Sequence, residues 1–266
     1  MVLMIKYWYI FKLAWQNSFV YRTSLFIWRF RQFLSTVMAL TVWNVIFNSQ
    51  ASAFGYTQSE MAGYVLLISL LQSLILASSL HGLAGEIYSG GITHHFLKPE
   101  KLFLSFGAVE AADKLKNAVF SCLEIGILWL IFKPSLLIPS LGIILLFSLW
   151  VLAGILIHFY ITILFGTLGF WTPDSWGPKF LFFMFLDFTA GKLYPLDIFP
   201  TAIQQLILLT PFPYFSYVQI QLFLQRLDLG QIYLYSFGLA FWTVLSWWLA
   251  HRAWKKGLSG YEATGQ

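Results

Sequence analysis

Long apolar runs without charge are the feature that most constrains this chain. The stretch MAGYVLLISLLQSLILASSL, from Met61 to Leu80, contains no charged residue. A run of this length matches a bilayer, because an α-helix crosses the hydrocarbon core in about 20 residues. Only 10% of the residues are charged and 59% are hydrophobic, whereas soluble domains carry about 25% charged residues. The chain is therefore predicted to be an integral membrane protein made of helices.

Six segments are predicted to span the membrane. They cover about residues 25–47, 61–80, 117–132, 138–165, 179–193 and 229–250. Residues 1–22 precede them and mix lysines with aromatic side chains, which is typical of a helix lying along the membrane surface. The expected fold is all-α, with an interfacial helix over residues 1–22 and a single transmembrane domain over residues 23–266.

Prolines interrupt the apolar sequence before the last predicted span. They are Pro195, Pro200, Pro211 and Pro213. A proline inside a helix removes a backbone donor and clashes with the preceding turn, so prolines this dense exclude one straight span. Residues 195–225 are predicted to form extracellular half-helices that re-enter the membrane, with their irregular backbone buried in protein.

The distribution of basic residues predicts the orientation. With a cytoplasmic N-terminus, only Lys133, Lys192 and Arg226 of the 16 lysines and arginines fall outside. This bias follows the positive-inside rule and predicts that both termini lie on the cytoplasmic side of a plasma membrane. Arg29 and Arg31, near the start of the first span, are expected to snorkel to the lipid headgroups. Because the basic residues lie at the ends of apolar runs, they do not indicate a nucleic-acid partner.

The polar segment 81–116 is predicted to be a functional cytoplasmic loop, since simple helix connections are shorter. Leu83 and Ile87 are spaced to share one face of a short helix, which Gly90 and Gly91 can end. A short amphipathic helix on the cytoplasmic side offers a surface to a partner protein or to headgroups.

Two stretches of the sequence resemble one known family. GEIYSGGITHHFLKP resembles the first cytoplasmic loop of permease subunits of type-2 ABC exporters, in which a Glu and a Gly precede a Leu-Lys-Pro ending. Residues 186–224, which begin LDFTAGKLYPLDIFP, resemble the extracellular half-helices of the same family. The order of the predicted elements also agrees over nearly the whole chain.

The resemblance implies an ATP-driven exporter. The segment 81–100 would hold a coupling helix seated on a separate ATPase subunit, which would bind ATP and Mg²⁺, so that this chain itself needs no cofactor. A second permease subunit is implied, more often an unlike chain than a copy. The expected cargo is an amphipathic or hydrophobic small molecule, such as a drug or a lipid, moved outward through the cell inner membrane, as in multidrug efflux.

The resemblance also assigns two groups of site residues. The ATPase contact would include Glu86, Ile87, Tyr88, Gly90, Gly91, Phe96, Lys98 and Pro99. An extracellular gate turn would include Gly191, Tyr194, Pro195, Pro200, Pro211 and Pro213.

Two acids and one histidine lie inside the predicted spans, where such groups are costly and are often functional. Glu124, His158 and Asp187 are candidates for the transport path. They leave an alternative open, a secondary transporter or channel in which Glu124 and Asp187 bind protons or cations. A purely structural role, with each group hydrogen-bonded inside the protein, also remains open, as does a membrane enzyme acting on lipid.

Motifs for catalysis and nucleotide binding are absent from the sequence. It contains no G-x-x-x-x-G-K-[ST], G-x-S-x-G, H-E-x-x-H or C-x-x-C. The chain is therefore predicted to be a transport subunit and not an enzyme. Because the adjacent His94 and His95 would diverge by about 100° on a helix, no metal site is predicted. The single cysteine, Cys122, is expected to be a small buried side chain.

Overall fold

The computed structural model describes residues 2–49, 52–98, 101–134 and 138–261. The longer helices are α1 (Val2–Asn17), α2 (Arg22–Asn48), α3 (Gln58–Leu71), α6 (Leu102–Phe132), α7 (Leu141–Gly166), α8 (Trp176–Thr189) and α11 (Leu229–Ser259). The short ones are α4 (Leu83–Tyr88), α5 (Thr93–Phe96), α9 (Thr201–Leu208), α10 (Tyr217–Phe223), and the 3₁₀ turns η2 (Ser79–Gly82), η3 (Thr167–Phe170), η4 (Leu196–Ile198) and η5 (Phe212–Phe215). Strands β1 (Ser52–Ala53) and β2 (Tyr56–Thr57) form an antiparallel hairpin.

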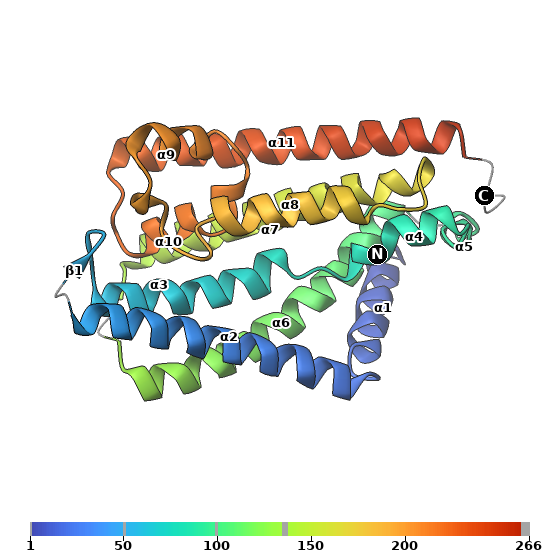
Figure 1. The fold of residues 1–266 in the computed structure, drawn as a ribbon. Coiled ribbons are helices and arrows are strands. Elements are labelled where there is room, and N and C mark those ends of the chain that lie inside the picture. The colour runs from blue at the N-terminus through green and yellow to red at the C-terminus, as the bar shows by residue number, and fades with distance from the viewer. Residues whose placement is uncertain (1, 50–51, 99–100, 135–137, 262–266) are drawn as a thin grey trace.

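The long helices run lengthwise and leave two distinct ends (Figure 1). One end holds α1, which crosses the long helices, together with α4, α5 and the two ends of the chain. We call it the terminal end. The opposite end holds the β-hairpin, α9 and α10, and we call it the hairpin end.

Among the described residues, five helices are long and apolar enough to cross a membrane. They are α2, α3 with its continuation to Leu76, α6, α7 with η3, and α11. The predicted all-α membrane fold is therefore confirmed. The predicted span 179–193 corresponds to α8, which has 14 residues, fewer than the about 20 that cross a bilayer. The count of six spans and the re-entry of the half-helices stay predictions.

The segment predicted as the loop 81–116 is mostly helical. It contains α4, α5 and the first half of α6, which starts at Leu102 and continues without a break through the predicted span 117–132. Charged residues made this half of α6 resemble a loop. In the structure they are buried, as Glu110 and Lys114 are 3% and 7% exposed, and they stay in the helix because they pair with each other.

Helix α3 ends in a π-helical turn, η1 (Gln72–Leu76), and the backbone becomes extended at Ala77. A π turn and a break leave carbonyl groups without helical donors. Lys114 of α6 supplies the donor: its Nζ lies 2.8 Å from the Ile75 carbonyl oxygen and also donates to the Ala77 carbonyl. The buried lysine thus stabilises the point where α3 turns toward α4.

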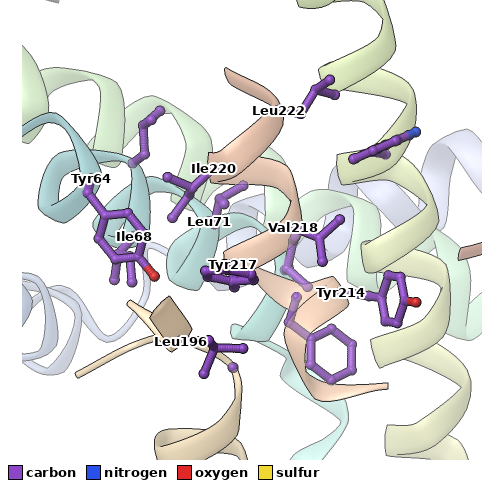
Figure 2. Packing of buried hydrophobic residues seen from close by; sticks show 14 of the residues in the cluster. Tyr64, Ile68, Leu71, Leu196, Tyr214, Tyr217, Val218, Ile220 and Leu222 are labelled. Atoms are coloured by element: carbon purple, nitrogen blue, oxygen red, sulfur yellow. The ribbon is translucent and has the colours of Figure 1, made fainter. Parts of the chain in front are cut away.

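The main core surrounds α10, which is almost fully enclosed. Phe215, Val218 and Ile220 have no exposed surface. Figure 2 shows Tyr217 and Ile220 of this segment beside the α3 side chains Ile68 and Leu71. Close packing gives these side chains many dispersion contacts, which are what stabilises helix association in a membrane, so the contacts hold the short helix between longer ones.

Candidate transport cavity and coupling segment

A cavity of about 700 Å³ opens between α2, η1, α6 and α8. Its charged lining consists of Arg29, Arg31, Lys116, Lys192, Asp113 and Asp187. Trp28, Phe183 and Leu186 give it an apolar part. The cavity therefore presents both signs of charge beside aromatic and aliphatic surface. We call it the transport cavity.

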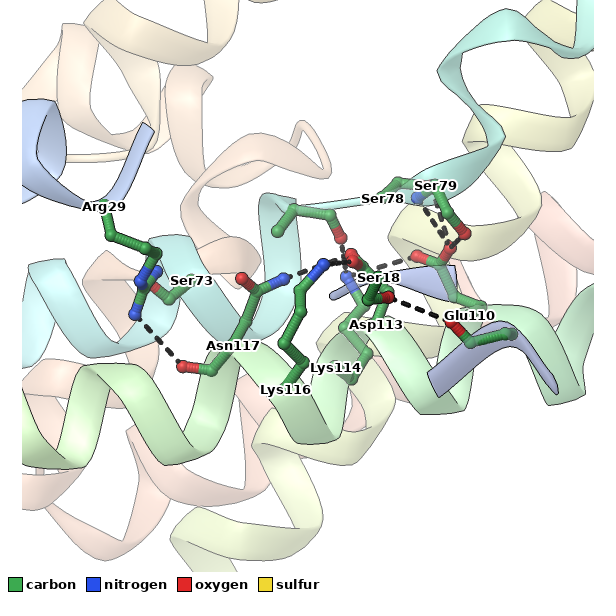
Figure 3. A network of polar contacts seen from close by, with 12 residues as sticks. Ser18, Arg29, Ser73, Ser78, Ser79, Glu110, Asp113, Lys114, Lys116 and Asn117 are labelled. Atoms are coloured by element: carbon green, nitrogen blue, oxygen red, sulfur yellow. Dashed lines mark hydrogen bonds and ion pairs between the residues drawn. The ribbon is translucent and has the colours of Figure 1, made fainter. Parts of the chain in front are cut away.

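Arg29 forms one wall of the transport cavity and points toward α6 (Figure 3). Its Nε lies 3.0 Å from Glu124 Oε1, and its side chain is 13% exposed. Nη2 donates to Ser121 Oγ at 2.9 Å and to the Asn117 carbonyl at 3.2 Å, and Nη1 donates to Ser73 Oγ at 3.3 Å. The prediction that Arg29 snorkels was wrong, because α6 and η1 offer its guanidinium a carboxylate and hydroxyl oxygens inside the protein.

Glu124 stands behind Arg29 and does not itself line the transport cavity. Its Oε2 is buried and has no hydrogen-bond partner among the described residues. Sequence reasoning singled out Glu124 but missed Arg29 as its partner. No local signal links the two, because Glu124 lies 95 positions after Arg29 and on a different helix.

Asp187, the second acid predicted for the transport path, lines the transport cavity from α8. Its Oδ1 accepts a hydrogen bond from Lys192 Nζ at 2.6 Å. On the opposite wall, Asp113 accepts from Lys116 and from the Asn117 amide. Each cavity carboxylate thus has a cation of its own, supplied from the same part of the chain.

A second buried ion pair lies beside the broken end of α3 (Figure 3). Glu110 and Lys114 are 3.3 Å apart and one helical turn apart on α6. The other oxygen of Glu110 accepts from Ser78 Oγ at 2.9 Å and from the Ser79 backbone at 3.2 Å. Sequence reasoning placed both residues in a loop, although an i,i+4 Glu–Lys pair is itself a helix signal.

His158, the third candidate for the transport path, is buried in α7, 1% exposed. Its ring lies 6.4 Å from that of His81 and 5.9 Å from that of Phe215. His158 does not line the transport cavity, whereas His81 does. His81 is exposed at the cavity, and partial desolvation by the surrounding protein lowers its pKa. The nearby Lys179 and Lys114 lower this pKa further against the opposing effect of Glu110. His81, which was not predicted, thus lines the cavity, whereas His158, which was predicted, lies behind it.

Helix α4 is fixed to the terminal ends of α7 and α11 by close backbone contact. A Cβ added at Gly169 would lie 2.1 Å from the Ala84 carbonyl oxygen, and one added at Gly166 would lie 2.5 Å from a Leu83 methyl. The Tyr261 hydroxyl donates to the Ile87 carbonyl at 3.0 Å. Gly90, with φ +79°, follows α4 in the left-handed conformation that glycine adopts readily.

The predicted ATPase-contact residues differ in exposure. Glu86, Phe96 and Lys98 are exposed, Tyr88, Gly90 and Gly91 are half-buried, Ile87 is buried, and Pro99 lies outside the described residues. Leu97 was not predicted and is 83% exposed. We call residues 86–98 the coupling segment. Its outer surface is formed by α5 and the residues after it, while Ile87 anchors α4 below them.

The predicted gate turn lies at the hairpin end and begins several short helices. Pro195, Pro200 and Pro211 immediately precede η4, α9 and η5, where the missing proline donor costs nothing. Gly191 has φ +76°, and its carbonyl accepts from the Tyr64 hydroxyl at 2.7 Å. Tyr194 stacks edge-on against Phe199, and Pro213 is buried within η5.

Comparison with known families gives one result that covers most of the chain. A family model described as "ABC-2 family transporter protein" matches residues 33–265. The matched range contains the coupling segment and the η1, α6 and α8 walls of the transport cavity. Comparison with curated proteins finds no match.

Proposed function

The chain belongs to the ABC-2 transporter family as a membrane permease, and from that premise we propose that it moves an amphipathic small molecule outward at the expense of ATP bound elsewhere. A separate ATPase subunit, which would carry the ATP and Mg²⁺, is the proposed partner, because this sequence contains no phosphate-binding loop. The terminal end would face the cytoplasm and the hairpin end the outside. A second permease subunit, a different chain more often than a copy, would complete the pathway.

The observation that carries the proposal is the rigid attachment of the coupling segment. Ala84 of α4 touches Gly169 of η3 with no room for a side chain between them, and Gly257 of α11 meets the Phe170 ring in the same way. A force applied to α4 is therefore transmitted directly to α7 and α11. Phe96 and Leu97 are 42% and 83% exposed, so they offer a partner subunit an apolar contact surface on this segment.

The transport cavity supports an amphipathic cargo over a purely hydrophobic one. Its Arg31 and Lys116 would contact a polar head, while Trp28 and Phe183 would contact an apolar body. A wholly apolar cargo would desolvate these charges without replacing their hydrogen bonds, which is costly. Asp187 and Arg29 would act in the same path as binding groups, with Glu124 fixing the orientation of Arg29.

The alternative, a proton- or cation-driven carrier, is less well supported by the same contacts. Glu124 and Asp187 are each paired with a cation, Arg29 and Lys192. A bound Na⁺ or proton would have to compete with that partner. A requirement of transport for a proton gradient, with no requirement for ATP, would favour the carrier.

The proposal is tested by capture of the partner subunit. The tagged chain is extracted from its native membrane, and co-purifying proteins are assayed for ATP hydrolysis. Replacing residues 86–98 with a Gly/Ser linker, or introducing the milder pair Phe96→Asp and Leu97→Asp, is expected to abolish capture of an ATPase. Replacing residues 172–175, the loop between η3 and α8, serves as the matched control and should leave capture intact. Absence of any ATPase with the unaltered chain would overturn the proposal.

A further inference from the structure

A second cavity, of about 610 Å³, lies at the hairpin end, apart from the transport cavity. Its walls come from η4, α9, η5, α10 and the first turns of α11. This volume falls within the range of about 300–1,000 Å³ in which small-molecule sites occur. None of the residues assigned so far to cargo or ATPase binding lines it. We call it the outer cavity.

One wall of the outer cavity is held in a fixed arrangement around Asp197. The hydroxyls of Tyr56 and Tyr217 donate to its carboxylate at 2.5 Å and 2.8 Å, and Gln221 Nε2 donates at 2.9 Å. Gln204 bridges to the Tyr217 hydroxyl at 3.0 Å. Because donors already occupy both carboxylate oxygens, Asp197 organises the wall and has little capacity left to bind a cation.

One polar atom in the lining residues of the outer cavity is buried and unused. Gln221 is 3% exposed, and its Oε1 has no hydrogen-bond partner among the described residues. Tyr214 and Tyr235, which are 5% and 7% exposed, also line this cavity. Buried polar groups are usually satisfied, so an unused acceptor in the wall of a cavity indicates a polar occupant.

The charges in the lining exclude a strongly charged occupant. Asp197 and Arg226 are its ionised groups and cancel each other. Arg226 is engaged by stacking on Tyr56 at 3.9 Å and by donating to the Gly55 carbonyl at 3.0 Å. An anion would therefore find no free cation there, and an ammonium group would find only an occupied carboxylate.

We propose that the outer cavity binds a neutral polyhydroxylated molecule the size of one or two sugar rings. Amide and tyrosine side chains both donate and accept hydrogen bonds, as hydroxyl groups do, whereas phosphate only accepts and ammonium only donates. The rings of Tyr214 and Tyr235, 6.3 Å apart and nearly perpendicular, and the Leu208 and Leu234 side chains supply apolar surface for the C–H faces of such a ring.

The test measures ligand binding to the full chain in lipid nanodiscs by saturation-transfer NMR. Three probes that carry C–H protons are compared, which are maltose, methylammonium and methyl phosphate. Maltose is expected to receive saturation and the two ions to receive none. Tyr235 and Gln205 both line the outer cavity. The variant Tyr235→Phe with Gln205→Leu removes their polar groups without touching Asp197, and it is expected to weaken maltose binding about fivefold or more.

The matched control is Tyr233→Phe, on the same helix but 75% exposed, which should bind maltose as the unaltered chain does. The proposal is overturned if maltose receives no saturation, if methylammonium or methyl phosphate binds in its place, or if the paired variant binds maltose unchanged. Capture of an ATPase by the coupling segment is independent of all these outcomes, so the permease assignment would stand either way.

Discussion

The terminal end and the hairpin end satisfy their buried polar groups in opposite ways. At the terminal end, charges pair with charges, as Arg29 does with Glu124 and Lys114 with Glu110. At the hairpin end, a single carboxylate, Asp197, accepts hydrogen bonds from neutral hydroxyls and amides.

This difference has an energetic consequence. Removing one member of a buried ion pair leaves the other charge unpaired at a large cost, whereas removing both members costs little. Removing the shared acceptor of a neutral network leaves several donors unsatisfied at once, each at a smaller cost. The stability of the terminal end is therefore expected to depend on keeping both charges of each ion pair or neither. The stability of the hairpin end is expected to depend on the single carboxylate that accepts the hydrogen bonds.

The largest effect is expected from the backbone contact that fixes the terminal end. Gly169→Ala places a methyl group 2.1 Å from the Ala84 carbonyl, so α4 must move away from η3. We expect a loss of about 3 kcal/mol in the free energy of unfolding, measured by thermal denaturation in detergent. Gly142→Ala, in α7 with no atom within 4 Å of the added carbon, should be neutral or stabilising. If the two variants have equal stability, the close contact between Gly169 and Ala84 is refuted.

The next effect tests charge balance at the terminal end. Arg29→Met leaves Glu124 without its cation and is expected to lower stability by about 2 kcal/mol, discounted because both side chains are 13% exposed. Adding Glu124→Leu should restore most of the loss. Denaturation of the single and double variants gives the coupling energy. Additive losses would mean that the pair does not act as a unit.

A smaller effect is expected at the hairpin end. Asp197→Ala removes the shared acceptor of Tyr56, Tyr217 and Gln221, and we expect a loss of about 1.5 kcal/mol, since the site is partly open to water. Asp197→Asn keeps one acceptor oxygen and should lose about half as much. The same denaturation assay applies, and a full loss in the asparagine variant would indicate that the negative charge itself is required.

The smallest effect is a pH dependence of opposite sign at the two ends. The pKa of His81 is lowered by partial desolvation. As the pH drops below about 6.5, this histidine therefore binds a proton in the unfolded chain before it does in the folded one, and stability falls. The pKa of Tyr56 is raised by burial and by its bond to Asp197, so stability falls above about pH 10, where the unfolded tyrosine ionises.

Melting temperature against pH distinguishes the two ends. His81→Asn should reduce the fall of the melting temperature at acid pH and leave its fall at alkaline pH unchanged. Tyr56→Phe should reduce only the fall at alkaline pH. His94→Asn, at an exposed position of the coupling segment, is the control for the fall at acid pH. If the melting temperature of His81→Asn still falls at acid pH as it does in the unaltered chain, another group causes that fall.

Long apolar runs and closely spaced prolines could be interpreted from the sequence because each acts on the local backbone. The segment 25–47 became α2, and Pro195, Pro200 and Pro211 each begin a short helix. Hydrophobic length and the missing proline donor act within a few residues, so no tertiary information is needed.

Contacts between distant segments could not be predicted in the same way. Arg29 pairs with a glutamate that lies 95 positions later in the chain, and the break after α3 supplies further partners for Glu110 and Lys114 of α6. Cys122 is exposed on α6, contrary to the prediction, because it lies on a face of the helix that the other described elements leave uncovered, whereas the neighbouring Ser121 is buried. Such outcomes depend on which face of each helix meets protein, which one sequence does not reveal.

The π turn η1 contains one residue more than an α-helical turn would, because its backbone hydrogen bonds close from i to i+5. Deleting one residue between Gln72 and Leu76 would convert it to ordinary α-helix and leave the direction of the chain beyond it nearly unchanged. Gln72, Ser73 and Leu76 line the transport cavity, and the deletion would change which of these side chains face it. The extra residue therefore determines the cavity lining separately from the position of the coupling segment.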